Sequence, residues 1–237
     1  MDKNKKMSSP DRSCPAGPDI SRSCVKTMFD SKFIHVYDLQ YEEGRHYFDA
    51  SRRTADEIAA VKTDEEFRKM VPDAVSCFVI IVLPDKEPRL LLTEEFRYPA
   101  GRFLLSVPAG LIDPGDRGNG IPALTAAARE IEEETGLKIS EGDSLKLVNP
   151  LVFSTPGMSD ESNALACAVI NRGDSASLEA QLSQKGASGS ELFDGFLFMT
   201  KEQAGKAIRD GADGRGIYYS VYTWMGMMYF ISDMWKE

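Results

Sequence analysis

The alternation of apolar and polar residues divides the chain into a polar beginning, a short strand-rich segment and a longer segment of alternating strands and helices. Residues 1–29 are rich in Lys, Ser, Pro and Asp, and they predict a flexible tail. The segments 33–37 and 46–49 carry strand-like residues, and Glu42-Glu43-Gly44 between them predicts a turn. We therefore expect a small N-terminal β subdomain over residues 30–72, with a helical or irregular extension at its end.

The remaining residues, 73–237, predict one larger domain. Residues 75–83 form a nearly continuous apolar run, which is typical of a strand covered on both faces. Residues 122–135 predict a helix, because Pro122 suits a first turn, the alanines favour helix and Gly136 suits the end. Further strands are expected at 89–96, 103–107, 145–153, 163–170 and 192–199, and a helix at 201–210. The spacing is not that of a doubly wound sheet, and it favours an α/β/α sandwich around a mixed sheet.

The helix predicted over residues 122–135 carries an unusual acidic face. Glu130, Glu133 and Glu134 lie at positions i, i+3 and i+4, so their carboxylates share one side of the helix. Like charges this close repel each other, and a divalent cation with oxygen ligands would compensate them. The alternative is an acidic face that is simply solvated.

The sequence around this face resembles a known family. Residues 129–137 read Arg-Glu-Ile-Glu-Glu-Glu-Thr-Gly-Leu, which fits the second half of the Nudix box. Residues 108–115 resemble the start of that box in the ADP-ribose (ADP-sugar) pyrophosphatase branch, and residues 154–161 resemble a loop typical of that branch. The resemblance implies an α/β fold, the Nudix α/β/α sandwich around a mixed β-sheet, with a small N-terminal β subdomain.

The first half of the box departs from the family pattern. After the Gly that corresponds to Gly110 and five further residues the family has Glu, whereas this chain has Asp116. Twelve residues then separate Asp116 from Arg129, five more than the seven of the family, and the extra ones fall within residues 117–121. A longer surface loop is tolerated because closure entropy grows slowly with length. Whether the shorter Asp116 side chain reaches Arg129 or the metal position is open from the sequence.

The resemblance assigns roles to the residues of the box. Glu130 and Glu134 are expected to be the main ligands of Mg²⁺ or Mn²⁺, with the carbonyl of Ala109 completing the site. Glu133 is expected to be a further ligand or catalytic support, and Arg129 to orient a carboxylate. A cation held in this way neutralises the pyrophosphate and lowers the pKa of bound water.

The general base is expected outside the box, in a loop that follows it. Glu191 precedes the last expected strand, and residues 186–189 before it are small enough to form a loop that closes over a substrate. Glu161 is the rival candidate. For either glutamate the alternative is an ordinary surface position.

Substrate contacts are expected from two other segments. Arg97 resembles the family arginine that contacts the substrate phosphates, which a guanidinium binds well. The alternative is a structural ion pair with a carboxylate. Phe48 and Arg53 resemble the N-terminal aromatic and basic residues that contact the nucleotide, although an aromatic residue on a strand is more often packed.

Composition narrows the choice of partners. The net charge of −9 argues against a general nucleic-acid binder. Four cysteines without metal-type spacing, together with a charged beginning that lacks a secretory pattern, favour a cytoplasmic protein that does not span a membrane.

The resemblance therefore implies an enzyme, a Mg²⁺-dependent Nudix pyrophosphohydrolase. Its expected reaction is hydrolysis of a nucleoside diphosphate sugar, above all ADP-ribose to AMP and ribose 5-phosphate. Two alternatives stay open: a different diphosphate substrate, such as an NDP-hexose or a dinucleoside polyphosphate, or a catalytically weak ADP-ribose sensor. The resemblance also implies a homodimer to which the N-terminal β unit contributes.

Overall fold

The computed structural model describes residues 17–118, 120–184 and 191–237 and divides into two compact units. The smaller unit contains the described residues up to Phe67 together with Met158–Asp160. The larger unit contains Arg68–Gly157 and Glu161–Glu237. Three residues of the segment 154–161 therefore belong to the N-terminal unit, although they follow the helix of the box in sequence.

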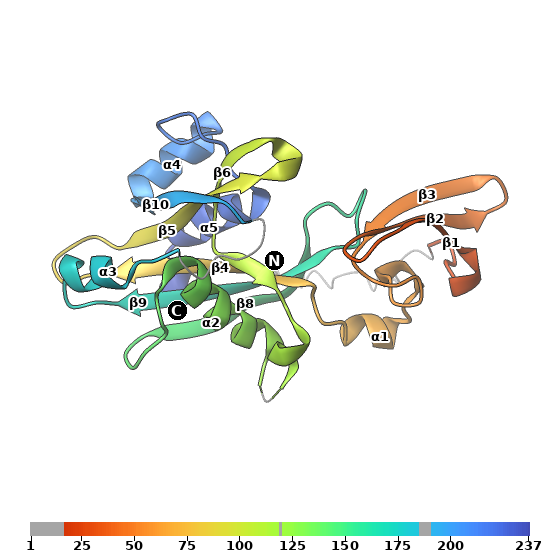
Figure 1. The fold of residues 1–237 in the computed structure, drawn as a ribbon, viewed down its shortest axis with the longest axis horizontal. Coiled ribbons are helices and arrows are strands. Elements are labelled where there is room, and N and C mark those ends of the chain that lie inside the picture. Colours follow the sequence, from red (N-terminus) through yellow and green to blue (C-terminus); the bar gives the residue numbers. More distant parts are fainter. Residues whose placement is uncertain (1–16, 119, 185–190) are drawn as a thin grey trace, which may run out of the picture. The chain divides into compact units, whose positions relative to one another are not determined.

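The smaller unit is built on a three-stranded antiparallel sheet in the order β1-β2-β3 (Figure 1). The strands are β1 (Val25–Asp30), β2 (His35–Glu42) and β3 (Arg45–Ser51). The turn between β2 and β3 has Gly44 at φ 72°, a left-handed conformation that suits glycine. The tail predicted over residues 1–29 extends too far, because residues 25–29 are part of β1.

The core of this unit is small. Tyr37 and Leu39 on β2 pack with Ile58 and Val61, which follow β3 in sequence. The short helices of the unit are η1 (Arg22–Cys24), η2 (Ala59–Val61) and α1 (Asp64–Arg68). A three-stranded sheet with so few buried side chains gains little free energy from apolar burial alone.

The larger unit is built on a seven-stranded sheet whose main path runs β10-β5-β4-β9-β8, with β6 beside β5 and β7 beside β4. The pair β4–β9 is parallel and the other pairs are antiparallel, so the sheet is mixed. The strands are β4 (Ala74–Val82), β5 (Arg89–Arg97), β6 (Arg102–Ser106), β7 (Ala109–Leu111), β8 (Ser144–Phe153), β9 (Ser162–Asn171) and β10 (Phe193–Met199). The short β7 was not predicted from the sequence.

Helices cover both faces of this sheet (Figure 1). Val75, Cys77 and Val79 of β4 pack in one apolar cluster with α2, whereas Phe78 and Ile80 pack in a second cluster with α4 and α5. Burial on both faces explains the continuous apolar run of β4. The helices are α2 (Pro122–Thr135), α3 (Ser175–Gln181), α4 (Lys201–Asp210), α5 (Val221–Ile231), η3 (Tyr98–Ala100), η4 (Pro114–Arg117) and η5 (Met234–Lys236). The expected α/β/α sandwich around a mixed sheet is confirmed.

Helix α2 has the bounds predicted for it, and it places the acidic face. Pro122 stands in its first turn, and Gly136 ends it in the left-handed conformation at φ 76°. Ala127 and Ile131 are fully buried against the sheet, which turns the side of Glu130 toward β7. Within the described ranges, no helix is long and apolar enough to cross a bilayer.

Candidate active site

The carboxylate of Glu130 lies against the backbone of Gly110 on β7. A Cβ added at Gly110 would stand 1.9 Å from Glu130 Oε1 and 2.0 Å from its Cδ. Gly110 in turn pairs with Val75 on β4, so the strand on which the carboxylate lies is fixed to the centre of the sheet. Only glycine leaves room for Glu130 in this place.

Glu134 is the most deeply buried carboxylate of α2, with 4% of the residue exposed. Its Oε1 accepts a hydrogen bond from the N–H of Ala109 at 3.3 Å, whereas its Oε2 has no partner among the described residues. Burial raises the pKa of Glu134 well above the usual range, and the bond from Ala109 opposes this shift only in part. A buried carboxylate oxygen without a partner is costly, and a cation or a proton would relieve the cost.

Arg129 connects the acidic side chains of this region. Its Nη1 donates to Glu130 Oε1 at 2.7 Å and to Glu133 Oε2 at 3.1 Å. Its Nη2 donates to Asp116 Oδ2 at 3.0 Å and to the carbonyl of Leu111 at 2.9 Å. The guanidinium thus orients three carboxylates and fixes them to the strand that carries Gly110.

Asp116 stands where the family has Glu, and its contacts show whether the shorter side chain reaches Arg129. It lies in η4, is 6% exposed, and its Oδ2 accepts from the N–H of Asp113 at 2.9 Å as well as from Arg129. Burial is the largest single influence on the pKa of Asp116, but the hydrogen bonds from Arg129 and Asp113 outweigh it and lower that pKa. The shorter side chain therefore reaches Arg129. The extra residues 117–121 lie between η4 and α2, and of these Asn119 is outside the described residues.

The charges of neighbouring carboxylates raise the pKa values of Glu130 and Glu134. Burial raises the pKa of Glu130 to about 7, and the charges of Glu133 and Glu191 add to this shift. The charges of Glu95, Glu130 and Glu191 likewise help to raise the pKa of Glu134. Glu191 is therefore the general-base candidate whose charge acts on the box. The loop residues 186–189 that were expected beside it lie outside the described residues.

The rival candidate, Glu161, has a different neighbour. It immediately precedes β9, and its charge raises the pKa of Tyr222 on α5. Burial is the larger cause of that shift. Helix α5 packs in the apolar cluster on the face of the sheet opposite to α2.

The donor set suits a hard divalent cation, although the side chains do not form a complete cage. In the part of the chain that the structure describes, no group of three His, Cys, Asp or Glu side chains is gathered closely enough to hold a metal ion. Arg129 holds Glu130 and Glu133, so these carboxylates would have to turn toward the ion. In favour of a metal, Glu134 offers a buried oxygen that has no partner among the described residues, and carboxylate oxygen is the ligand that Mg²⁺ prefers. We find that the residues fit such an ion.

Arg97 is the last residue of β5, the strand that also carries Glu95. Its Nη2 lies 2.6 Å from Glu95 Oε2, and 44% of its side chain is exposed. The structural ion pair that was the alternative for Arg97 is therefore present. The pairing does not test whether Arg97 also contacts a phosphate, which stays a prediction.

The two nucleotide-contact candidates of the smaller unit differ in exposure. Phe48 on β3 is 57% exposed, so the alternative that it is simply packed within the chain is wrong. The side chain of Arg53 is 9% exposed, and its Nη1 donates to the carbonyl of Asp160 at 2.7 Å and to Asp160 Oδ2 at 3.1 Å. Of the two, Phe48 presents more of its surface to a ligand.

Sequence reasoning missed the two aspartates around Arg53. Asp49 Oδ1 accepts from the N–H of Asp160 at 2.9 Å, and Asp160 Oδ2 accepts from the N–H of Ala59 at 2.8 Å. The carbonyl of Met158 accepts from the N–H of Ala50 at 2.9 Å. This set of contacts explains why Met158–Asp160 belong to the smaller unit. The sequence singled out Met158–Asp160 only as part of the family-like segment 154–161.

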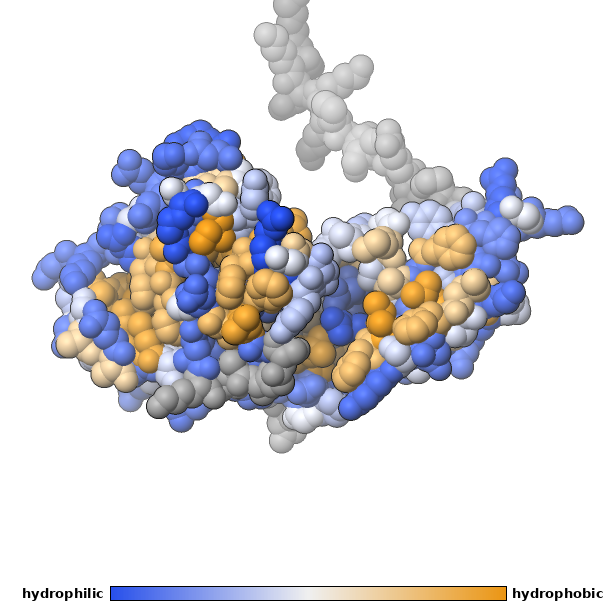
Figure 2. Space-filling view, turned by 45° about the horizontal axis from the view of Figure 1, so that its top comes forward, coloured by the Kyte–Doolittle hydropathy of each residue, from blue (hydrophilic) through white to orange (hydrophobic). Residues whose placement is uncertain are grey.

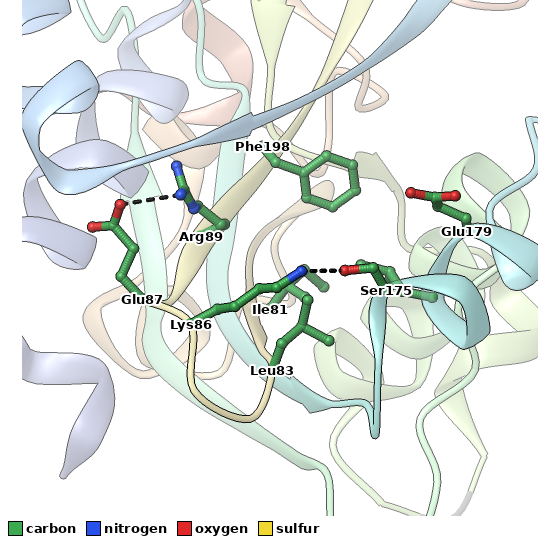
Figure 3. Close-up of a pocket in the computed structure, with 9 residues that line it drawn as sticks. Ile81, Leu83, Lys86, Glu87, Arg89, Ser175, Glu179 and Phe198 are labelled. Carbon is green, nitrogen blue, oxygen red and sulfur yellow. Dashed lines mark hydrogen bonds and ion pairs between the residues drawn. The ribbon is translucent and has the colours of Figure 1, made fainter.

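A cavity of about 230 Å³ lies elsewhere in the larger unit (Figure 3). Its lining residues come from β4, β5, β10 and α3 and the turn after β4, and they are Ile81, Leu83, Lys86, Glu87, Arg89, Ser175, Leu178, Glu179 and Phe198. Lys86 Nζ bonds Ser175 Oγ at 2.6 Å, and Arg89 pairs with Glu87 at 3.0 Å. Its basic groups therefore already have partners. Ile81 is five residues from Ser76, which pairs with Ala109, so about 17 Å of strand separate the two places.

Residues 73–218 match the NUDIX domain family. Nudix hydrolase 14, chloroplastic, of Arabidopsis thaliana is 35% identical over 111 residues, which are 41% of this chain and 35% of that protein. ADP-ribose pyrophosphatase of Saccharomyces cerevisiae is 29% identical over 150 residues, 62% of this chain and 57% of that protein. ADP-sugar pyrophosphatase of Mus musculus is 31% identical over 106 residues, 45% and 44% of the two chains.

One solved structure, described as the crystal structure of ADP compounds hydrolase, covers 86% of this chain with a TM-score of 0.47 and 17% identity, and 89% of that chain is matched. This chain spans less than two thirds of the length of the curated relatives above. The family match is the stronger finding, because it covers more than half of the chain and includes the acidic face of α2. By this match, the chain belongs to the Nudix family.

Proposed function

We propose that this protein is a Mg²⁺- or Mn²⁺-dependent pyrophosphohydrolase of nucleoside diphosphate sugars, with ADP-ribose as its main substrate and AMP and ribose 5-phosphate as its products. The observation that carries the proposal is the buried Glu134, whose Oε2 lacks a partner in the part of the chain that the structure describes, beside a Glu130 held against Gly110. The names of the yeast and mouse relatives support the substrate class.

In this proposal Glu130, Glu134 and the carbonyl of Ala109 hold the metal, with Glu133 as a further ligand or support. The ion supplies positive charge against the pyrophosphate and lowers the pKa of bound water. Arg129 keeps the carboxylates in place through its bonds to Asp116 and Glu130.

The proposed chemistry is a displacement at phosphorus. Glu191 accepts a proton from the attacking water, whose oxygen forms the new bond to phosphorus. The bridging P–O bond breaks, and its electron pair leaves with the departing phosphate. Glu161 is the alternative base. Glu191 is favoured because its charge raises the pKa values of Glu130 and Glu134.

On the substrate side, we assign the phosphates to Arg97 and the nucleotide to Phe48 and Arg53. Arg97 has an exposed guanidinium, and bidentate pairing with phosphate is its usual role. Phe48 presents an exposed ring that suits stacking on adenine. Arg53 is already engaged with Asp160, so its part in binding the nucleotide rests on the family resemblance alone.

We propose a homodimer as well. The smaller unit exposes several large apolar side chains, and Figure 2 shows apolar surface over its sheet. These side chains are Met28, Phe29, Phe33, Ile34, Tyr47 and Phe48. A unit with a small core and so much exposed apolar area gains stability when a second copy covers it. A cytoplasmic location is proposed because Cys77 and Cys167 are free, buried thiols.

The second candidate is a sensor that binds ADP-ribose without rapid turnover. The absence of a preformed group of three ligands in the described ranges favours it. Against it, Asp116 keeps its contact with Arg129 in spite of the altered box. A different diphosphate substrate, such as an NDP-hexose or a dinucleoside polyphosphate, is the alternative within the same enzyme class.

A substrate panel tests the proposal. The full chain is incubated with ADP-ribose, other ADP-sugars, GDP-mannose and a dinucleoside polyphosphate, each with Mg²⁺, with Mn²⁺ and with EDTA, and product release is measured. We expect AMP from ADP-ribose only when metal is present. Turnover of GDP-mannose but not ADP-ribose would refute the substrate, and tight ADP-ribose binding without AMP release would establish the sensor.

A further inference from the structure

Strand β5 presents two different charged faces at its end. Side chains alternate along a strand, and Leu91 packs in the cluster with α2 whereas Leu90 and Leu92 pack in the cluster with α5. Glu95 and Arg97 share the face of Leu91, which is the face of the box. The neighbouring Glu94 shares the opposite face.

The contacts of these two glutamates agree with their placement. Glu94 Oε1 pairs with Arg215 at 2.5 Å, in the segment between α4 and α5. Glu95 Oε2 pairs with Arg97 at 2.6 Å, and the charge of Glu95 acts on Glu134 in α2. Two adjacent glutamates thus each bind an arginine, but only Glu95 does so beside the acidic residues of the box.

Glu95 also pairs with β10, the strand that follows the proposed general base Glu191. It pairs with Phe193 on β10, and the next residue of β5, Phe96, donates its N–H to the carbonyl of Leu192 at 2.8 Å. Glu191 precedes Leu192, and its charge raises the pKa of Glu95, although burial raises it more. Glu95 therefore lies among Glu134, Glu191 and Arg97.

Burial and the charge of Glu191 raise the pKa of Glu95, and the charge of Arg97 opposes this shift. Only 12% of the Glu95 side chain is exposed, whereas 44% of the Arg97 side chain is exposed. The buried partner can therefore hold one edge of the guanidinium while other N–H groups stay accessible. Arginine binds phosphate with a planar fork of donors, and this binding needs a fixed orientation.

We propose that Glu95 is a positioning residue, which holds Arg97 in the orientation that binds the phosphates of the substrate. The proposal rests on the proposed function, because it takes a nucleoside diphosphate as the ligand. Glu95 is not assigned to the metal or to proton transfer. Its effect is on substrate affinity, and it acts through Arg97.

The test compares Glu95→Gln with Glu94→Gln as a matched control. Glutamine keeps the size of the side chain and removes the charge, so the ion pair with Arg97 becomes a weaker hydrogen bond from the guanidinium to a neutral amide oxygen. Steady-state hydrolysis of ADP-ribose is measured at saturating Mg²⁺, together with the dependence on Mg²⁺ concentration. We expect Glu95→Gln to raise KM by about tenfold with kcat within about twofold of the wild type. Glu94→Gln should leave KM, kcat and the Mg²⁺ dependence unchanged.

A double-variant comparison shows whether Glu95 acts through Arg97. Glu95→Gln added to Arg97→Ala should raise KM no further than Arg97→Ala alone, because the group that Glu95 positions is already absent. The Glu95→Asp variant, which keeps the charge, should fall between wild type and Glu95→Gln. Thermal denaturation of every variant identifies any loss of the folded state.

Three results would overturn the proposal: an unchanged KM in Glu95→Gln, additive effects of the two variants, or a lower kcat with a raised Mg²⁺ requirement. The last would place Glu95 among the metal ligands. The failure of the proposed function looks different, because the wild type itself would then release no product. If the wild type binds ADP-ribose without cleaving it, the same variants are compared by Kd, with the same expected ratio. If it does neither, the proposal falls with the proposed function.

Discussion

Replacing Gly110 by alanine should disable the proposed metal site while leaving the fold intact. The added Cβ would stand 1.9 Å from Glu130 Oε1, 2.0 Å from its Cδ and 2.4 Å from its Oε2. All three contacts involve the end of a flexible side chain rather than backbone. Glu130 can therefore withdraw, but it cannot keep its present position.

The size of the displacement follows from these distances. An ordinary contact begins at 3.4 Å, so Glu130 Oε1 has to move away from Gly110 by about 1.5 Å. Misplacing a catalytic group by about 1 Å costs roughly 100-fold in rate. The loss of the Glu130–Arg129 hydrogen bond should lower the free energy of unfolding by only about 1–3 kcal/mol.

The assay is kcat/KM for ADP-ribose with Mg²⁺, accompanied by thermal denaturation. Gly115→Ala is the matched control, because a Cβ at Gly115 meets none of the described residues within 4 Å. We expect Gly110→Ala to lose about 100-fold or more in kcat/KM and Gly115→Ala to behave as wild type. Gly110→Ala activity within about threefold of wild type would show that the position of Glu130 against Gly110 does not matter for the reaction, and the reasoning would be refuted.

Three further predictions concern other parts of the structure. Asp116→Asn, which removes the charge paired with Arg129, should lower the free energy of unfolding by about 1–3 kcal/mol in urea titrations, and an unchanged value would show that the pair is not structural. Replacing both Arg53 and Asp160 should lower the free energy of unfolding by less than the sum of the two single replacements, and the difference should be about 3 kcal/mol for a buried pair. Additive effects would show that this pair does not hold Met158–Asp160 in the smaller unit. Burial, together with the charge of Asp160, raises the pKa of Asp49 from 3.8 to about 6. The folded state therefore holds this proton more tightly than the unfolded chain, so stability from Asp49 is present below pH 4 and is lost as pH rises to about 6. Urea titrations at pH 5 and 7.5 should accordingly show Asp49→Asn gaining stability relative to wild type at pH 7.5, and a difference independent of pH would contradict this.

The elements that the sequence predicts well are those with local signals. Helix α2 begins at Pro122 and ends before Gly136, as expected, because both residues act through their own backbone conformations. Strand β4 was predicted because burial on both faces requires an apolar residue at nearly every position. These signals need no knowledge of partners distant in the chain.

The elements that were missed depend on distant partners. Strand β1 has only one side chain of intermediate exposure, that of Val25, so it lacks the alternation that marks a half-buried strand. Strand β7 has three residues, and it is a strand only because it pairs with β4. No local pattern distinguishes either from a loop.

In the candidate site, too, local spacing predicts some features, and contacts between distant residues determine the others. Glu130, Glu133 and Glu134 share one helix face because of their spacing alone. The bond of Asp116 to Arg129 depends on the path of the loop between η4 and α2, which the sequence does not reveal. The pairing of residue 53 with residue 160 joins positions 107 apart in the chain and could be seen only in the structure.

The central claim is that Glu134 belongs to a metal site that cleaves a pyrophosphate bond. The most direct measurement is the initial rate of AMP release from ADP-ribose with Mg²⁺ in the wild type, in Glu134→Gln and in Glu132→Gln. Glu132 is an exposed residue of the same helix and pairs with Lys138 at 2.9 Å, so its variant controls for a loss of charge. The account predicts AMP release by the wild type and Glu132→Gln, and a loss of at least about 100-fold in Glu134→Gln. Equal rates in Glu134→Gln and the wild type would contradict it.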